Sequence, residues 1–70
     1  MMKQMLSISG MSCQHCKRHV TNALNELNGV QSVFVSLEDR QAIIQVETAF
    51  SYDELRTVIE EVGYELTKVE

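Results

Sequence analysis

The order of six short periodic segments is what most constrains the fold of this 70-residue chain. Apolar residues recur with a period of two, then about 3.6, then two, two, 3.6 and two. The sequence contains no proline, so glycines and polar clusters mark the boundaries between segments. A chain this short buries only about 60% of the surface that its unfolded form exposes. We therefore predict one small domain over residues 1–70, in the order strand, helix, strand, strand, helix, strand.

The first half of the chain predicts a strand followed by a helix. Leu6 and Ile8 alternate with more polar neighbours, which predicts a strand that ends at Gly10. Apolar residues then recur at helical spacing from about Cys16, at Val20, Ala23, Leu24 and Leu27. Gly29 stands where a left-handed residue often closes a helix, so we expect the first helix to end there.

The middle of the chain predicts a β-hairpin. In residues 33–37, Val33, Val35 and Leu37 alternate with Phe34 and Ser36. In residues 42–46, Ala42, Ile44 and Val46 recur at every second position, and the polar residues 38–41 separate the two runs. Two such runs joined by a short polar segment are typical of neighbouring antiparallel strands.

The last third predicts a capped helix and a short strand. Ser51 stands three residues before Glu54, which is the spacing of a helix capping box, and an apolar stripe follows and ends at Gly63. Residues 64–69 alternate again and predict a final strand, although their alternation leaves open which side chains face inward.

This order of elements is typical of an α+β sandwich of the ferredoxin-like βαββαβ type. We expect an antiparallel four-stranded sheet with both helices on one face. The other face is predicted to be open, with polar residues such as Ser7, Ser36 and Gln45 pointing outward.

Composition excludes several functional classes. The formal charge of −4 argues against general binding to nucleic acid, which requires a basic surface to neutralise phosphates. The apolar runs are too short to span a bilayer, and residues 1–9 lack the continuous apolar stretch of a signal peptide. We therefore expect a cytoplasmic protein that does not insert into a membrane.

Both cysteines of the chain lie in one loop. Cys13 and Cys16 are two residues apart in the string Met11-Ser12-Cys13-Gln14-His15-Cys16. Two thiolates at this spacing can bind one soft metal ion or alternate between dithiol and disulfide. A position at a helix start lowers the pKa of a thiol, and we expect the charges of Lys17 and Arg18 to add to that effect.

A closed zinc site is not expected in this loop. Structural zinc requires four ligands, and only His15 and His19 are available nearby to complete the set. An open two-thiolate site suits Cu(I), which is soft and accepts few ligands. Such a site also leaves room for an incoming thiolate from a partner.

Several motifs together resemble those of the heavy-metal-associated domain, in particular the bacterial cytosolic copper chaperones. The residues that carry the resemblance are the string Gly10-Met11-Ser12-Cys13-Gln14-His15-Cys16, the pair Gly29-Val30, the run 33–37 and the pair Gly63-Tyr64. The resemblance covers essentially the whole chain.

The resemblance implies a carrier that binds Cu(I) through Cys13 and Cys16. It implies transfer of the ion to a copper-transporting P-type ATPase or to a copper-responsive regulator, such as a repressor. By position, Met11 would lie under the loop and Tyr64 would lie near the metal. His15 would be either a weak third contact that tunes the thiols or a plain surface residue.

Three alternatives remain open from the sequence. The cysteine pair could form a dithiol/disulfide redox protein, although we expect no enzymatic turnover because the chain lacks the Gly-Pro between cysteines that is typical of thioredoxin-like enzymes. The chain could also be a metal-binding module of a larger ATPase. We expect a monomer, and dimerisation through a shared metal ion is left undecided.

Overall fold

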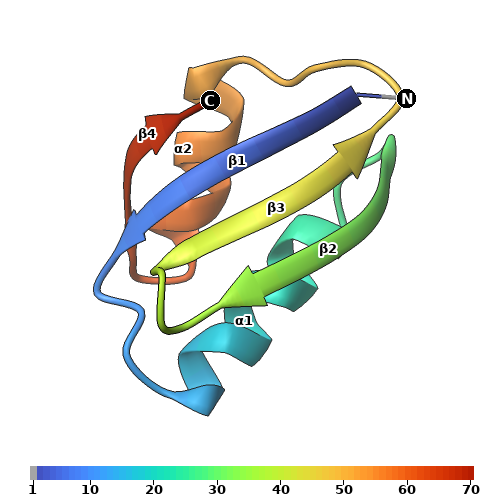
Figure 1. Cartoon of the computed structure of the whole chain (residues 1–70). Helices are drawn as coiled ribbons and strands as arrows, with labels where there is room; N and C mark the ends of the chain where they lie inside the picture. Colours follow the sequence, from blue (N-terminus) through green and yellow to red (C-terminus); the bar gives the residue numbers. More distant parts are fainter. Residues whose placement is uncertain (1) are drawn as a thin grey trace.

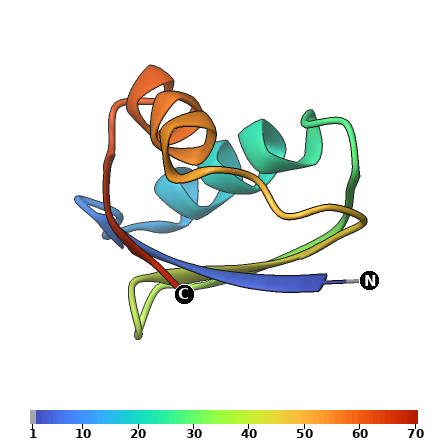
Figure 2. The same ribbon diagram turned by 90° about the horizontal axis from the view of Figure 1, so that it is seen from above.

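The computed structural model describes residues 2–70 and contains the six predicted elements. These are β1 (Met2–Ser9), α1 (Gln14–Asn25), β2 (Val30–Ser36), β3 (Gln41–Val46), α2 (Tyr52–Glu61) and β4 (Glu65–Val69). The four strands form one sheet in the order β2-β3-β1-β4, and every neighbouring pair is antiparallel. Both helices pack on the same face of this sheet (Figures 1 and 2). The predicted ferredoxin-like βαββαβ fold is thus confirmed.

The core lies between the sheet and the two helices. Each helix buries a pair of residues one turn apart, Val20 with Leu24 in α1 and Leu55 with Ile59 in α2. This i, i+4 spacing places both side chains on the face that meets the sheet. The strands contribute the alternate residues Leu6, Ile8, Val35, Ala42, Ile44, Val46 and Leu66. Within residues 2–70, no helix is long and apolar enough to cross a membrane.

The open face of the sheet carries two rows of side chains that run across the strands. Ser36, Gln41 and Ser7 are opposite one another in register, and Gln45 lies further along β3 on the same face. A neighbouring row consists of Phe34, Ile43 and Met5. The predicted polar row is present, and an apolar row accompanies it.

The first helix differs from its predicted bounds. It begins at Gln14 rather than about Cys16, and it ends at Asn25 rather than at Gly29. A turn separates the end of α1 from β2, and Gly29 lies in this turn instead of capping the helix. The apolar residue Leu27 packs against the core from the turn, which is why helical periodicity continued past the helix end.

Irregular pairing explains two further differences in the strands. β2 begins at Val30, three residues before the predicted start, because a bulge between Val30 and Ser32 interrupts the alternation. In β4 the register shifts opposite Ser7 and Ile8, so Leu66 and Val69 both face the core although they are three residues apart. Alternation along the sequence alone therefore could not show which side chains of β2 and β4 face the core.

Gln4 is the buried polar residue of the sheet, with 8% of its surface exposed. Its side-chain amide donates to the carbonyl of Phe50 and accepts from the Phe50 N–H, each at 3.0 Å. Both polar ends are therefore satisfied, and the connection between β3 and α2 is fastened to β1.

Candidate metal centre

The cysteine loop joins the end of β1 to the start of α1 and is anchored at its base. Gly10 has φ of 91°, a backbone conformation that favours glycine, and a Cβ there would lie 3.6 Å from the ring of Tyr64. Met11 then turns its side chain into the core, where only 1% of it is exposed. Ser12 and Cys13 remain exposed at the surface. The loop is therefore fixed from below while its thiols stay accessible.

The two thiols lie against each other. The Sγ atoms of Cys13 and Cys16 are 3.2 Å apart and both thiols are free, with Cys13 exposed and Cys16 half-buried. Two sulfurs bound to one tetrahedral ion at about 2.3 Å would be about 3.8 Å apart, and further apart around a linear ion. Metal binding therefore requires the sulfurs to separate, and the exposed side chain of Cys13 is the one free to move.

The start of α1 places unpaired backbone N–H groups beside the thiols. Cys13 is the N-cap residue, but its side chain forms no capping hydrogen bond, and the first turn contains no acidic residue. The first N–H groups of a helix have no partner within the helix and carry partial positive charge. This uncapped start is suited to stabilising a thiolate.

Tyr64 reaches the loop because of how α2 ends. Gly63 adopts φ of 92°, its N–H donates to the carbonyl of Glu60, and the N–H of Tyr64 donates to the carbonyl of Ile59. These two bonds form a Schellman motif, in which the left-handed glycine reverses the chain. The motif fixes the direction in which Tyr64 leaves the helix, and its ring packs over Gly10.

Hydrogen bonds to Cys16 favour its thiolate form. They lower the pKa of Cys16 from its ordinary value of 9.0 to about 7, first through the Tyr64 hydroxyl, then through the Ser12 backbone and the Cys13 side chain. The same contact raises the pKa of Tyr64 to about 12, because the phenol remains a donor to the sulfur. The lowered pKa therefore raises the thiolate fraction of Cys16 near neutral pH above that of an ordinary cysteine.

The cause of this pKa shift differs from the one we predicted. Hydrogen bonding lowers the pKa of Cys16, whereas the charges of Lys17 and Arg18 are not among the causes. The contribution of the Ser12 backbone had no signal in the sequence, because it depends on the conformation of the loop and not on a side chain.

His15 lies on the exposed surface beside the site rather than in it. It lines a small hollow with Gln14 and Arg18, and no hydrogen bond within residues 2–70 joins its ring to either cysteine. His19 is also exposed. Across this part of the chain, no three His, Cys, Asp or Glu side chains are grouped closely enough to hold a metal ion together. The site thus offers two sulfur donors and an open side.

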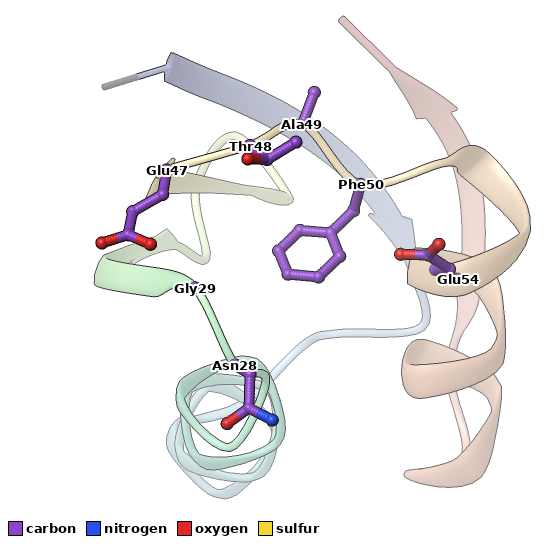
Figure 3. Close-up of a pocket in the computed structure, with 7 residues that line it drawn as sticks. All are labelled: Asn28, Gly29, Glu47, Thr48, Ala49, Phe50 and Glu54. Atoms are coloured by element: carbon purple, nitrogen blue, oxygen red, sulfur yellow. The ribbon is translucent and has the colours of Figure 1, made fainter.

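A hollow at the other end of the molecule lacks such donors. It has a volume of about 400 Å³ and lies between the turn after α1 and the connection that leads into α2. The ring of Phe50 points into it, whereas the carboxylate of Glu47 points away from the ring (Figure 3). No sulfur or imidazole lines this hollow.

The geometry at the loop can bind a soft ion and also release it. Two thiolates satisfy the preference of a soft cation, and the exposed side leaves space for a third thiolate to approach. Four-coordinate structural zinc would require two more ligands than the loop supplies.

Comparisons with known proteins agree with this geometry. A family model described as the heavy-metal-associated domain matches residues 5–65. The copper chaperone CopZ of Staphylococcus aureus (strain JH9) is 37% identical over 67 residues, which is 94% of this chain and 98% of the relative. A solved CopZ metallochaperone is 36% identical with a TM-score of 0.86, covering 94% of this chain and all of the other. A copper-binding domain from the P-type ATPase HMA7 is 27% identical with a TM-score of 0.85, over 100% and 99% of the two chains.

Proposed function

This chain belongs to the heavy-metal-associated domain family, and on that basis we propose that it is a copper chaperone that carries Cu(I) on Cys13 and Cys16. The observation that carries the proposal is the pair of thiols in contact at an exposed loop, one of them with its pKa lowered to about 7. A metal ion must displace the thiol protons when it binds, so a lowered pKa favours loading at neutral pH.

The donor set supports Cu(I) over zinc. Soft thiolates select Cu(I), and two sulfur ligands meet its low coordination requirement. The segment from Met11 to Arg18 contains no Asp or Glu that could add the oxygen ligand accepted by a harder cation. A relative of 37% identity that is named a copper chaperone supports the same metal.

We further propose that the ion leaves by ligand exchange. A cysteine of the partner would approach the open side of the site, bind the ion as a third ligand, and replace Cys13 first, because Cys13 is the more exposed of the two. Similarity to a copper-binding domain of a P-type ATPase supports an ATPase of this class as the recipient. A copper-responsive regulator with a comparable pair of cysteines is the other candidate.

An anaerobic titration tests the binding. Cu(I) is added to the protein in competition with a chelator, and the affinity is compared for the wild type, Cys13→Ser, Cys16→Ser and the control Ser12→Ala. We expect both cysteine variants to lose tight binding and the control to keep it. Equal affinity in all four proteins would refute the assignment of the site.

A transfer experiment tests the delivery. The copper-loaded protein is mixed with an ATPase amino-terminal domain that carries its own cysteine pair, and the metal content of each is measured after separation. Copper should appear on the acceptor, and an acceptor with both cysteines replaced by Ser should receive none. Transfer to that control would contradict ligand exchange.

The redox alternative predicts a different result. A dithiol oxidoreductase would reduce a model disulfide over many turnovers, whereas we expect one equivalent at most. Sustained turnover with a recycling reductant would replace the chaperone proposal.

A further inference from the structure

The two edges of the sheet differ in how they are protected against pairing with another strand. Natural proteins blunt edge strands with charged residues, prolines or bulges. The β4 edge has Glu65 and Lys68, a register shift, and an ion pair of 3.2 Å between Lys68 and Glu70. The β2 edge, Val30–Ser36, contains neither a charged residue nor a proline. Both edges contain an irregularity, but only the β4 edge also carries charged residues, so residues 32–36 of β2 lie beyond the bulge without this protection.

The usable part of the β2 edge is short and well defined. The bulge between Val30 and Ser32 interrupts it at one end, and the turn after Ser36 ends it at the other. Residues 32–36 remain, with Phe34 at their centre. Phe34 is 65% exposed, more than the other large exposed apolar residues, Met2 and Tyr52. A segment rich in Val and Phe and without charge has high β propensity.

We propose that the β2 edge pairs with the β2 edge of a second copy of this chain. A two-fold axis at Phe34 makes the pairing antiparallel and self-complementary, so that Ser32 lies opposite Ser36 of the other copy and Val33 opposite Val35. The two Phe34 rings meet at the axis on the open face. The two four-stranded sheets then form one continuous sheet.

The distribution of charge supports a second copy as the partner. A net charge of −4 makes two copies repel each other, so contact between copies is least unfavourable through a surface without carboxylates. β2 and the neighbouring apolar row of Ile43 and Met5 form such a surface. Glu38 and Asp39 lie in the turn beyond the paired residues, where they stay in solvent.

The pairing leaves both cysteine loops open. The end of β1, from which the loop leaves, is level with the C-terminal end of β2, because Ser7, Gln41 and Ser36 share one row. Antiparallel pairing of β2 therefore places the two loops at opposite ends of the joint sheet. This association needs no metal and does not depend on the proposed function.

Sedimentation analysis of the metal-free protein tests the proposal. The protein carries Cys13→Ser and Cys16→Ser, so that neither a metal ion nor a disulfide can link two copies. We expect the mean mass to rise from monomer toward dimer between about 10 μM and about 1 mM, the range of a small, weak interface. Adding Phe34→Lys should keep the protein monomeric, whereas Gln45→Lys, an exposed position of the open face on the inner strand β3, should not.

Two results would overturn the proposal. One is a monomer at every concentration. The other is equal loss of the dimer in the Gln45→Lys protein, which would indicate stacking of sheet faces instead of edge pairing.

Amide hydrogen exchange on the same cysteine-free protein gives a measurement without the Phe34 substitution. Residues 32–36 should include amides that exchange more slowly in concentrated than in dilute protein, while the amides of β4 should not change. Exchange that is independent of concentration along β2 would contradict edge pairing, even if the Phe34→Lys protein failed to fold.

Discussion

The two helices of this molecule begin in opposite ways. The N-cap residue of α2 is Ser51, whose hydroxyl accepts a hydrogen bond from the N–H of Glu54 at 3.2 Å, and the first turn of α2 contains Asp53 and Glu54. The N-cap residue of α1 is Cys13, whose side chain forms no capping bond, and the first turn of α1 has no acidic residue. The capping hydroxyl and the acidic residues stabilise the start of α2. The first N–H groups of α1 have no side-chain partner, so they and the positive end of the helix dipole can stabilise a nearby thiolate. The difference indicates that α1 lacks the stabilisation that a capping side chain would provide, and that its first N–H groups are available to the cysteine thiols instead.

Giving α1 a cap should have the largest effect. Cys13→Ser supplies the missing capping hydroxyl, so the metal-free protein should gain up to about 1 kcal/mol in free energy of unfolding. The same change removes one of the two proposed ligands, and Cu(I) affinity should fall by about 10²-fold to 10³-fold, judged from the binding energy per ligand of thiolate-rich sites. Denaturant unfolding and chelator competition measure the two effects.

Cys16→Ser is the matched control for this prediction. It should lose a comparable affinity without the gain in stability, because Cys16 lies within the first turn and is not the N-cap residue. A lower free energy of unfolding in the metal-free Cys13→Ser protein would show that a hydroxyl at this position does not cap α1.

Removing the Tyr64 hydroxyl should have the next largest effect. Tyr64→Phe keeps the ring over Gly10 but takes away the main cause of the lowered pKa of Cys16. The pKa should rise from about 7 toward 9.0, and at pH 7 the affinity for Cu(I) should fall up to about tenfold for each unit of that rise. Thiol titration by ultraviolet absorbance measures the pKa of Cys16, and chelator competition at several pH values measures the affinity for Cu(I).

The pH dependence gives this prediction its control. Well above pH 9 both proteins hold Cys16 as thiolate, so their affinities should converge. Because the folded state lowers this pKa, metal-free wild type should gain stability as pH rises from about 7 to 9, and the slope should be smaller in the variant. A difference in affinity that is constant with pH would point to lost packing instead.

Removing the cap of α2 tests the other side of the comparison. Ser51→Ala leaves the N–H of Glu54 without its acceptor, and the free energy of unfolding should fall by about 1 kcal/mol. Cu(I) affinity should not change, since α2 contributes no proposed ligand. Ser51→Thr, which keeps the hydroxyl, should retain most of the stability. A change in affinity would show that the two helix starts are coupled.

The smallest effect is expected from giving α1 the acidic first turn that α2 has. Gln14→Glu should stabilise the metal-free protein by about 0.3–1 kcal/mol through the helix dipole. The added negative charge should also raise the pKa of Cys16 and weaken copper binding slightly. Asn22→Glu, with the same charge in the last turn of α1, is the control: it should not stabilise the protein, because the dipole disfavours a carboxylate at that end, and it should leave the pKa of Cys16 unchanged.

Much of the fold could be predicted because periodicity and glycine positions agreed along the chain. The fold class and all six elements were predicted, and the Ser51 cap forms as expected. What failed were boundaries at irregular places. The bulge after Val30 hid the start of β2, and the shift opposite Ser7 and Ile8 hid the inward set of β4. Bulges depend on pairing with a neighbouring strand, which a single sequence does not display.

The candidate site was predictable in its residues and less so in its chemistry. The cysteine pair and Tyr64 could be identified from spacing and resemblance, and the structure brings Tyr64 to Cys16. The predicted charges of Lys17 and Arg18 are not among the causes of the lowered pKa of Cys16, whereas the largest cause is Tyr64, which lies 48 positions later in the sequence. The spacing of residues in the sequence does not show which of them donates a hydrogen bond to the sulfur of Cys16.

The Schellman motif that ends α2 makes the cysteine loop sensitive to insertions and deletions in a distant segment. One residue more or less between Ser51 and Gly63 would rotate the helix end by about 100° and turn Tyr64 away from Cys16. The same change in the connection before Ser51 would leave that angle intact. Among functional copies of this chain, gaps should therefore gather in the connection and be absent from α2, even where the exposed residues of α2 vary freely.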